Sequence, residues 1–80
     1  MSHLHHVIKD VNHKDRLLIA DLGYDCIFSV NKDWNFEIVH SFSRGNGPRH
    51  IVFDKEGYLY CDSELEPRIT KFDKDFKVIK

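Results

Sequence analysis

The residues best suited to chemistry lie in Gly45-Asn46-Gly47-Pro48-Arg49-His50, a Gly/Pro loop that ends in a guanidinium and an imidazole. The apolar run Ile51-Val52-Phe53 follows at once, so Arg49 is expected at the start of a strand. Its planar fork of donors suits a carboxylate, a phosphate or a developing oxyanion, and Pro48 would fix its direction at little entropic cost. The alternative is a surface arginine paired with an acidic side chain, and on this stretch alone both interpretations stay open.

Three histidines near the N-terminus, His3, His5 and His6, form a second candidate group. His3 and His5 would point to the same side of an extended segment. A metal site needs three or four converging ligands with a supporting shell, and no cysteine or carboxylate stands nearby at ligand spacing. We therefore predict no metal site at these histidines, with solvated terminal histidines as the simpler interpretation.

Asp21 and Asp25 flank Gly23 and are candidates for substrate binding. Aspartate also favours turns by accepting hydrogen bonds from nearby backbone amides, and this structural role is the more common one. Only Asp21 is kept as a candidate binding residue.

Composition narrows the class of protein. The chain is 41% apolar and 12% aromatic, which predicts a folded domain rather than a disordered tail. A net charge of −1 with mixed signs argues against nucleic acid or an anionic membrane as a partner. No apolar run is long enough to span a bilayer and no secretory signal is visible, so we predict a cytoplasmic protein. Cys26 and Cys61 stand alone inside strand-like runs and are expected to be reduced packing residues.

The elements that must position these residues are short strands. Apolar bursts rich in β-branched and aromatic residues alternate with clusters of Asn, Asp, Gly and Pro, which is typical of an all-β chain with tight antiparallel turns. The eight predicted strands are His6–Val11, Leu17–Asp21, Cys26–Asn31, Ile38–Ser43, His50–Asp54, Tyr58–Asp62, Arg68–Asp73 and Lys77–Ile79.

The chain also repeats itself. His6-Val7-Ile8 recurs as His50-Ile51-Val52, and Leu17-Leu18-Ile19 recurs as Leu59-Tyr60-Cys61. A four-stranded repeat of about 40 to 45 residues predicts a β-propeller blade, so we expect two four-stranded antiparallel blades, at 5–44 and 45–80, in a single unit without a linker. An eight-stranded sandwich or barrel is the alternative. Closed propellers need about 4 to 8 blades, so this chain should not act alone.

Four motifs in this order resemble the lactonase family of seven-bladed β-propellers, which includes bacterial 6-phosphogluconolactonases and carboxymuconate-lactonizing enzymes. The matching segments are His3-Leu4-His5-His6-Val7, Ala20-Asp21-Leu22-Gly23-Tyr24-Asp25, Gly47-Pro48-Arg49-His50 and Tyr58-Leu59-Tyr60 followed by Glu64-Leu65. The resemblance spans most of residues 3 to 76, which is about a quarter of a seven-bladed chain.

The resemblance implies a site around His5, Arg49 and Glu64, with His3, Asp21 and His50 as substrate-binding residues. It implies that His5 acts as base or acid, that Arg49 contacts an oxyanion or phosphate, and that Glu64 orients the base or transfers a proton. Two positions depart from the family pattern: Ser63 stands where asparagine is common, and His6 stands where serine is common.

Two hypotheses of function follow from the resemblance. The first is a fragment of a 6-phosphogluconolactonase-like enzyme, which would hydrolyse the sugar lactone 6-phosphoglucono-1,5-lactone to 6-phosphogluconate in the pentose phosphate pathway and be inactive alone. The resemblance implies no metal and no organic cofactor. The second is a non-catalytic propeller module or remnant that self-associates or binds a sugar-like ligand. Either would need the missing blades or further copies of itself as partners.

Overall fold

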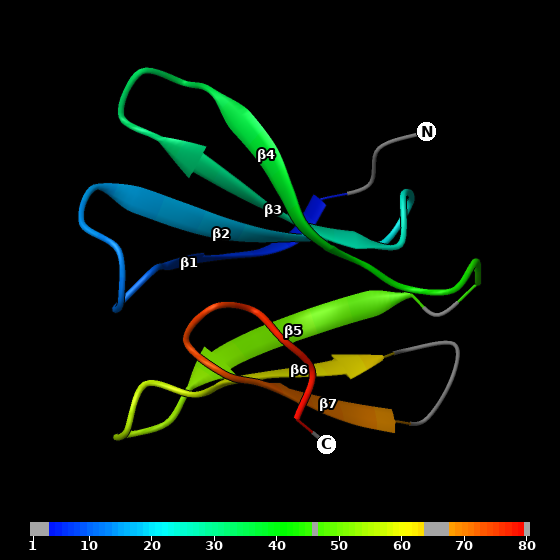
Figure 1. Cartoon of the computed structure of the whole chain (residues 1–80). Coiled ribbons are helices and arrows are strands. Elements are labelled where there is room, and N and C mark those ends of the chain that lie inside the picture. The colour runs from blue at the N-terminus through cyan, green and yellow to red at the C-terminus, as the bar shows by residue number, and fades with distance from the viewer. Residues whose placement is uncertain (1–3, 46, 64–67, 80) are drawn as a thin grey trace.

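Two antiparallel sheets make up the fold in a computed structural model, which describes residues 4–45, 47–63 and 68–79. The first sheet contains β1 (Leu4–Lys9), β2 (Arg16–Asp21), β3 (Cys26–Asn31) and β4 (Phe36–Ser41), in that order. The second contains β5 (Pro48–Phe53), β6 (Leu59–Ser63) and β7 (Arg68–Phe72), also in chain order. Figure 1 shows the two sheets one above the other, joined by the segment between β4 and β5. The predicted all-β fold class is confirmed.

The predicted eighth strand, Lys77–Ile79, is wrong. Among the described residues of this segment, Val78 forms an isolated bridge to Phe72, and the Ile79 amide donates to the Lys71 carbonyl over 2.7 Å. Val78 and Ile79 are about half exposed, so little apolar burial supports a longer ladder. The second sheet therefore has three strands rather than four.

Three hairpins use one turn geometry. In each, an Asn or Asp side-chain oxygen accepts hydrogen bonds from the backbone amides two and four residues further on, at 2.8–3.1 Å. The capping residues are Asn31, Asp54 and Asp73, and the residue three further on has a positive φ in every case. These side chains replace lost ladder bonds, which is why Asn and Asp mark the strand ends in the sequence.

The sequence repeat is also a repeat of strand register. Val7, Ile19 and Phe28 stand opposite one another across β1, β2 and β3. Ile51, Cys61 and Thr70 stand opposite one another in the same way across β5, β6 and β7. The strands β1, β2 and β3 are therefore equivalent to β5, β6 and β7 position by position.

The core lies between the sheets. Its fully buried members are Leu18, Ala20 and Ile27 from the first sheet and Ile51, Leu59, Cys61 and Phe72 from the second. The Phe72 ring packs edge to face on His40 and Phe42, with ring centroids 4.8 and 6.2 Å away. Burial lowers the pKa of His40 and so favours the neutral form of its imidazole. None of the described residues belongs to a helix that could cross a membrane.

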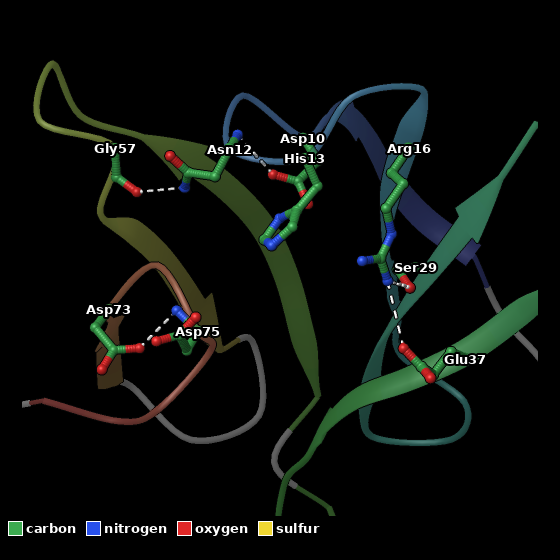
Figure 2. A network of polar contacts seen from close by, with 9 residues as sticks. All are labelled: Asp10, Asn12, His13, Arg16, Ser29, Glu37, Gly57, Asp73 and Asp75. Atoms are coloured by element: carbon green, nitrogen blue, oxygen red, sulfur yellow. Dashed lines mark hydrogen bonds and ion pairs between the residues drawn. The ribbon is translucent and has the colours of Figure 1, made fainter.

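A polar contact joins the turns of the two sheets. The Asn12 side-chain amide donates to the Gly57 carbonyl over 2.8 Å, as Figure 2 shows. The His13 ring stacks on Phe76, with centroids 5.6 Å apart. Gly57 has a φ of 90°, and an added Cβ would lie 2.7 Å from the Asn12 Oδ1 atom. A side chain at this position therefore meets both backbone strain and a collision.

Replacing Gly57 by alanine is expected to lower the free energy of unfolding by about 2 to 3 kcal/mol, from left-handed strain and the displaced Asn12 hydrogen bond. Gly45→Ala is the matched control, because Gly45 has a φ of 85° and no atom within 4 Å of an added Cβ. The free energy of unfolding of this variant should fall by only about 1 to 2 kcal/mol, because left-handed strain is the one effect of the added Cβ. Urea unfolding of both variants measures the difference, and equal losses would show that the Asn12 contact contributes nothing.

Candidate functional site

The first strands of the two sheets, β1 and β5, contact each other, and both contain a β-bulge at equivalent positions. In β1 the register shifts between Leu4 and His6, so His5 is the extra residue. In β5 it shifts between Pro48 and Ile51, where Arg49 and His50 lie. Bulges change the direction of side chains and are common next to active sites. His5 and Arg49 are the two candidate catalytic residues whose backbone the structure describes. They lie at matching bulges on the neighbouring strands β1 and β5.

The loop that precedes Arg49 is held by Asp25. The two carboxylate oxygens of Asp25 accept hydrogen bonds from the Gly45 and Gly47 amides, at 2.9 and 2.8 Å. The Asp25 carbonyl also accepts from the Phe42 amide over 2.8 Å. The turn between β2 and β3 therefore fixes the path by which the chain enters β5, and with it the position of Arg49.

A cluster of His6, His50 and Asp62 lies where β1, β5 and β6 meet. The Nδ1 atom of His6 accepts a hydrogen bond from the Ile51 amide over 2.9 Å, and its ring lies edge to face with His50, 5.3 Å between centroids. Asp62 accepts from the His50 amide over 2.7 Å, and its other oxygen lies 3.5 Å from the His50 Nδ1 atom. Because Nδ1 of His6 accepts, a neutral His6 ring carries its proton on Nε2.

The structure describes only part of the predicted site. His3, Glu64 and the side chain of His5 lie outside the described residues, so the catalytic trio stays a prediction. Arg49 is half-buried and adjoins His50, and both lie on β5 as expected.

Asp21 is fully buried, and its Oδ1 atom accepts from the Gly23 and Tyr24 amides at 2.9 and 3.2 Å. This gives Asp21 the turn-forming role, while a part in substrate binding stays a prediction.

Sequence reasoning missed the contributions of Asp25, His6 and Asp62. The hydrogen bonds of Asp25 reach residues twenty and twenty-two positions away, and those of His6 and Asp62 also cross between strands. No local sequence pattern predicts contacts between residues so far apart in the chain. The one available signal was the equivalence of His6 and His50 in the repeat, which predicts that the two rings occupy matching places on neighbouring strands.

A recess of about 330 Å³ lies across β2, β3 and β4 of the first sheet, lined by Arg16, Ser29, Asn31, Asn35, Phe36 and Glu37. The Arg16 guanidinium donates to Ser29 and lies 3.4 Å from a Glu37 oxygen (Figure 2). Its charge is thus satisfied within the chain. Within the described ranges, no three His, Cys, Asp or Glu side chains gather as metal ligands would.

Both cysteines are free and buried, as predicted. Burial, then the nearby Asp62 charge, raises the pKa of Cys61 to about 12, against the effect of a hydrogen bond from the Arg49 backbone. Burial, then Asp21 and Asp25, raises the pKa of Cys26 to about 11. Thiolate is the reactive form of cysteine, so neither side chain is suited to nucleophilic chemistry.

Native-state alkylation at pH 8 should therefore be slow at both cysteines. The thiolate fractions are on the order of 10⁻³ for Cys26 and 10⁻⁴ for Cys61, against about a quarter for an ordinary thiol. Iodoacetamide labelling followed by mass spectrometry measures this, with the urea-unfolded chain as the fast-reacting control. Native labelling as fast as that of the unfolded chain would contradict the buried placement.

Two bulged strands side by side at the start of consecutive equivalent sheets are the arrangement of neighbouring propeller blades around a central axis. The comparisons agree with this class of fold. Residues 1–79 match the sequence profile of the family described as "Lactonase, 7-bladed beta-propeller", and the chain belongs to this family.

A 6-phosphogluconolactonase of Formosa agariphila is 37% identical over 67 residues, which cover 72% of this chain and 19% of that protein. A crystal structure of a protein from Lactobacillus plantarum is similar with a TM-score of 0.73 and 27% identity, over 98% of this chain and 25% of the other. The chain therefore spans about a fifth of the curated relative and a quarter of the solved structure.

Proposed function

We propose that this chain supplies active-site strands of a lactone-hydrolysing propeller, with 6-phosphoglucono-1,5-lactone as substrate and 6-phosphogluconate as product. The observation that carries the proposal is the pair of equivalent bulges on the contacting strands β1 and β5, which hold His5 and Arg49. The similarity to a 6-phosphogluconolactonase supports the choice of lactone. As part of the same proposal, the reaction belongs to the pentose phosphate pathway in the cytoplasm.

Hydrolysis of a lactone sets three requirements. Water must lose a proton as its oxygen attacks the carbonyl carbon, the carbonyl oxygen must be stabilised as negative charge develops, and the ring oxygen must take up a proton as its bond to carbon breaks. We assign His5 to proton transfer, Arg49 to the oxyanion or the substrate phosphate, and Glu64 to orienting the base or moving a proton. The fixed loop before Arg49 supports its assignment, because a donor held in place costs no reorganisation during the reaction.

The proposal includes a requirement for more blades. Two sheets are fewer than the about 4 to 8 blades that close a propeller around its axis, so we expect no hydrolysis by the 80-residue chain as a monomer. Residues 1–80 would then act as one unit that contributes two consecutive blades. Measured turnover by a verified monomer would contradict this requirement.

A non-catalytic, sugar-binding module is the second candidate function. His6 occupies the position where the family commonly has serine, and its Nδ1 atom is engaged by the Ile51 amide. Ser63 occupies the position where asparagine is common, and it is buried. Both changes lie beside the proposed catalytic residues, and in this second candidate function they abolish hydrolysis and leave sugar binding intact.

A chimera separates the two functions. The segment of the Formosa agariphila relative that matches this chain is replaced by the chain, and hydrolysis of 6-phosphoglucono-1,5-lactone is followed by proton release. The catalytic proposal expects turnover above the spontaneous rate. Binding of 6-phosphogluconate without turnover by a folded chimera would favour the second candidate, and neither binding nor turnover would refute both.

A further inference from the structure

Each sheet has one apolar face turned away from the other sheet. The first open face is the side of β1–β4 turned away from the second sheet, and it carries Val7, Leu17, Ile19, Phe28, Val30, Phe36 and Ile38. Val7 and Ile38 are 50% and 54% exposed, whereas Ile19 and Val30, in the middle of this face, are buried. The second open face is the far side of β5–β7, and it carries Val52, Tyr60, Asp62, Ile69 and Lys71. Here Val52 and Ile69 are 61% and 68% exposed.

The shared register shows what the second open face is built to meet. Because Ile8, Leu18 and Ser29 align in the first sheet as Val52, Tyr60 and Lys71 align in the second, Val52 is equivalent to Ile8 and Tyr60 to Leu18. Ile69 is equivalent to Ile27 by the same register. Ile8, Leu18 and Ile27 pack against the second sheet in the core. The second open face therefore repeats a surface that a neighbouring sheet already covers elsewhere in this chain.

The first open face repeats the other half of that contact. Val7 is equivalent to Ile51, Leu17 to Leu59 and Val30 to Phe72. Ile51, Leu59 and Phe72 are the second-sheet residues that cover the first sheet, and all are at most 1% exposed. The chain thus carries both surfaces of its internal contact a second time, one on each outer side.

We propose that the second open face of one copy docks on the first open face of a second copy of this chain, head to tail. The contact reproduces the internal packing of the two sheets, with Val52, Tyr60 and Ile69 against the exposed Val7 and Leu17 of the second copy. A shallow pocket of about 220 Å³ between His50, Val52, Tyr60, Asp62 and Ile69 receives an apolar side chain of the second copy. This association does not depend on lactone hydrolysis.

The contact between copies is weaker than the internal one. Asp62 stands where the first sheet has Ala20, and Lys71 stands where it has Ser29. Lys71 lies over the rings of Tyr58 and Tyr60, with its Nζ atom 4.6 and 5.5 Å from their centroids. Docking must therefore cover one carboxylate and one ammonium group that the internal contact lacks, which costs desolvation. The association is expected to depend on protein concentration. It should strengthen in sulfate or phosphate salts, because these ions are excluded from the protein surface and so favour the burial of apolar groups.

Three Val→Lys variants test the head-to-tail contact by sedimentation over a range from low micromolar to near-millimolar chain. Val7→Lys blocks the first open face and Val52→Lys blocks the second, while Val11→Lys changes an equally exposed valine in the β1–β2 turn. The original chain and Val11→Lys should exceed the monomer mass as concentration rises. Val7→Lys and Val52→Lys should each stay monomeric, and an equimolar mixture should form a dimer with one copy of each, because each variant keeps the face that the other lacks.

Other outcomes overturn the proposal. An original chain that stays monomeric throughout the range shows that no second copy binds. Self-association by one blocked variant alone shows a contact between identical faces, and a mixture that stays monomeric shows that the two faces do not match. Far-UV circular dichroism checks the fold of each variant. Ile38→Lys and Ile69→Lys repeat the test at the outer strands of the same two faces if a valine variant fails to fold.

Discussion

Replacing Arg49 by alanine in the chimeric propeller is expected to lower lactone hydrolysis about 100- to 1,000-fold, the usual loss for a donor to a developing oxyanion. The expectation rests on the fixed position of Arg49. Asp25 holds the preceding loop through two amides, and the β5 bulge changes the direction of the strand at this point. A steady-state assay over a range of lactone concentrations measures kcat and KM separately.

The division between kcat and KM distinguishes the two roles proposed for Arg49. A fall in kcat at constant KM indicates an oxyanion contact, and a rise in KM at constant kcat indicates a contact to the substrate phosphate. Arg49→Lys should recover little activity in either case, because lysine lacks the planar fork of donors. Arg44→Ala removes an exposed arginine from the same connection and should leave both constants unchanged. Unchanged constants in Arg49→Ala would remove this residue from the site.

Replacing Phe72 by alanine is expected to lower the free energy of unfolding of the chain by about 3 to 5 kcal/mol. Phe72 has no exposed surface and packs between the sheets on His40 and Phe42. At about 0.05 to 0.15 kcal/mol per residue, a chain of 80 residues has about 4 to 12 kcal/mol of stability, so this loss is a large share of it. The variant should therefore unfold at a much lower urea concentration than the original chain, and urea titration followed by circular dichroism measures this.

Phe36→Ala is the matched control for this loss. The same side chain is removed, but Phe36 is 58% exposed and its ring contacts Phe28 at the edge of the first sheet. Its loss should be about 1 kcal/mol or less, measured at a chain concentration low enough to keep monomers. If the two variants unfold at the same urea concentration, the packing between the sheets does not stabilise the chain.

Local patterns in the sequence were enough to predict most of the strands and the repeat. Alternation of apolar and polar residues depends on the two-residue period of a strand, and each Asn or Asp that ends a strand binds the backbone of its own turn. Cys26–Asn31 was predicted with its observed bounds, and Arg68–Asp73 with one residue too many. Lys77–Ile79 failed because its apolar residues match a strand in pattern but gain little burial in the fold.

The family was also accessible from the sequence, since four motifs in order occupy most of the chain, while the roles of its motif residues stay predictions. The residues that hold the site in place could not be predicted from the sequence. Asp25 reaches the Arg49 loop and His6 binds the Ile51 amide only because the two sheets meet along β1 and β5. Asp62 holds His50 because β5 and β6 pair within the second sheet. Local hydrogen bonds and side-chain periodicity depend on residues that are close together in the sequence. Contacts between sheets depend on strand register and on bulges. Tertiary structure alone therefore decided which side chains face one another and which apolar faces stay uncovered.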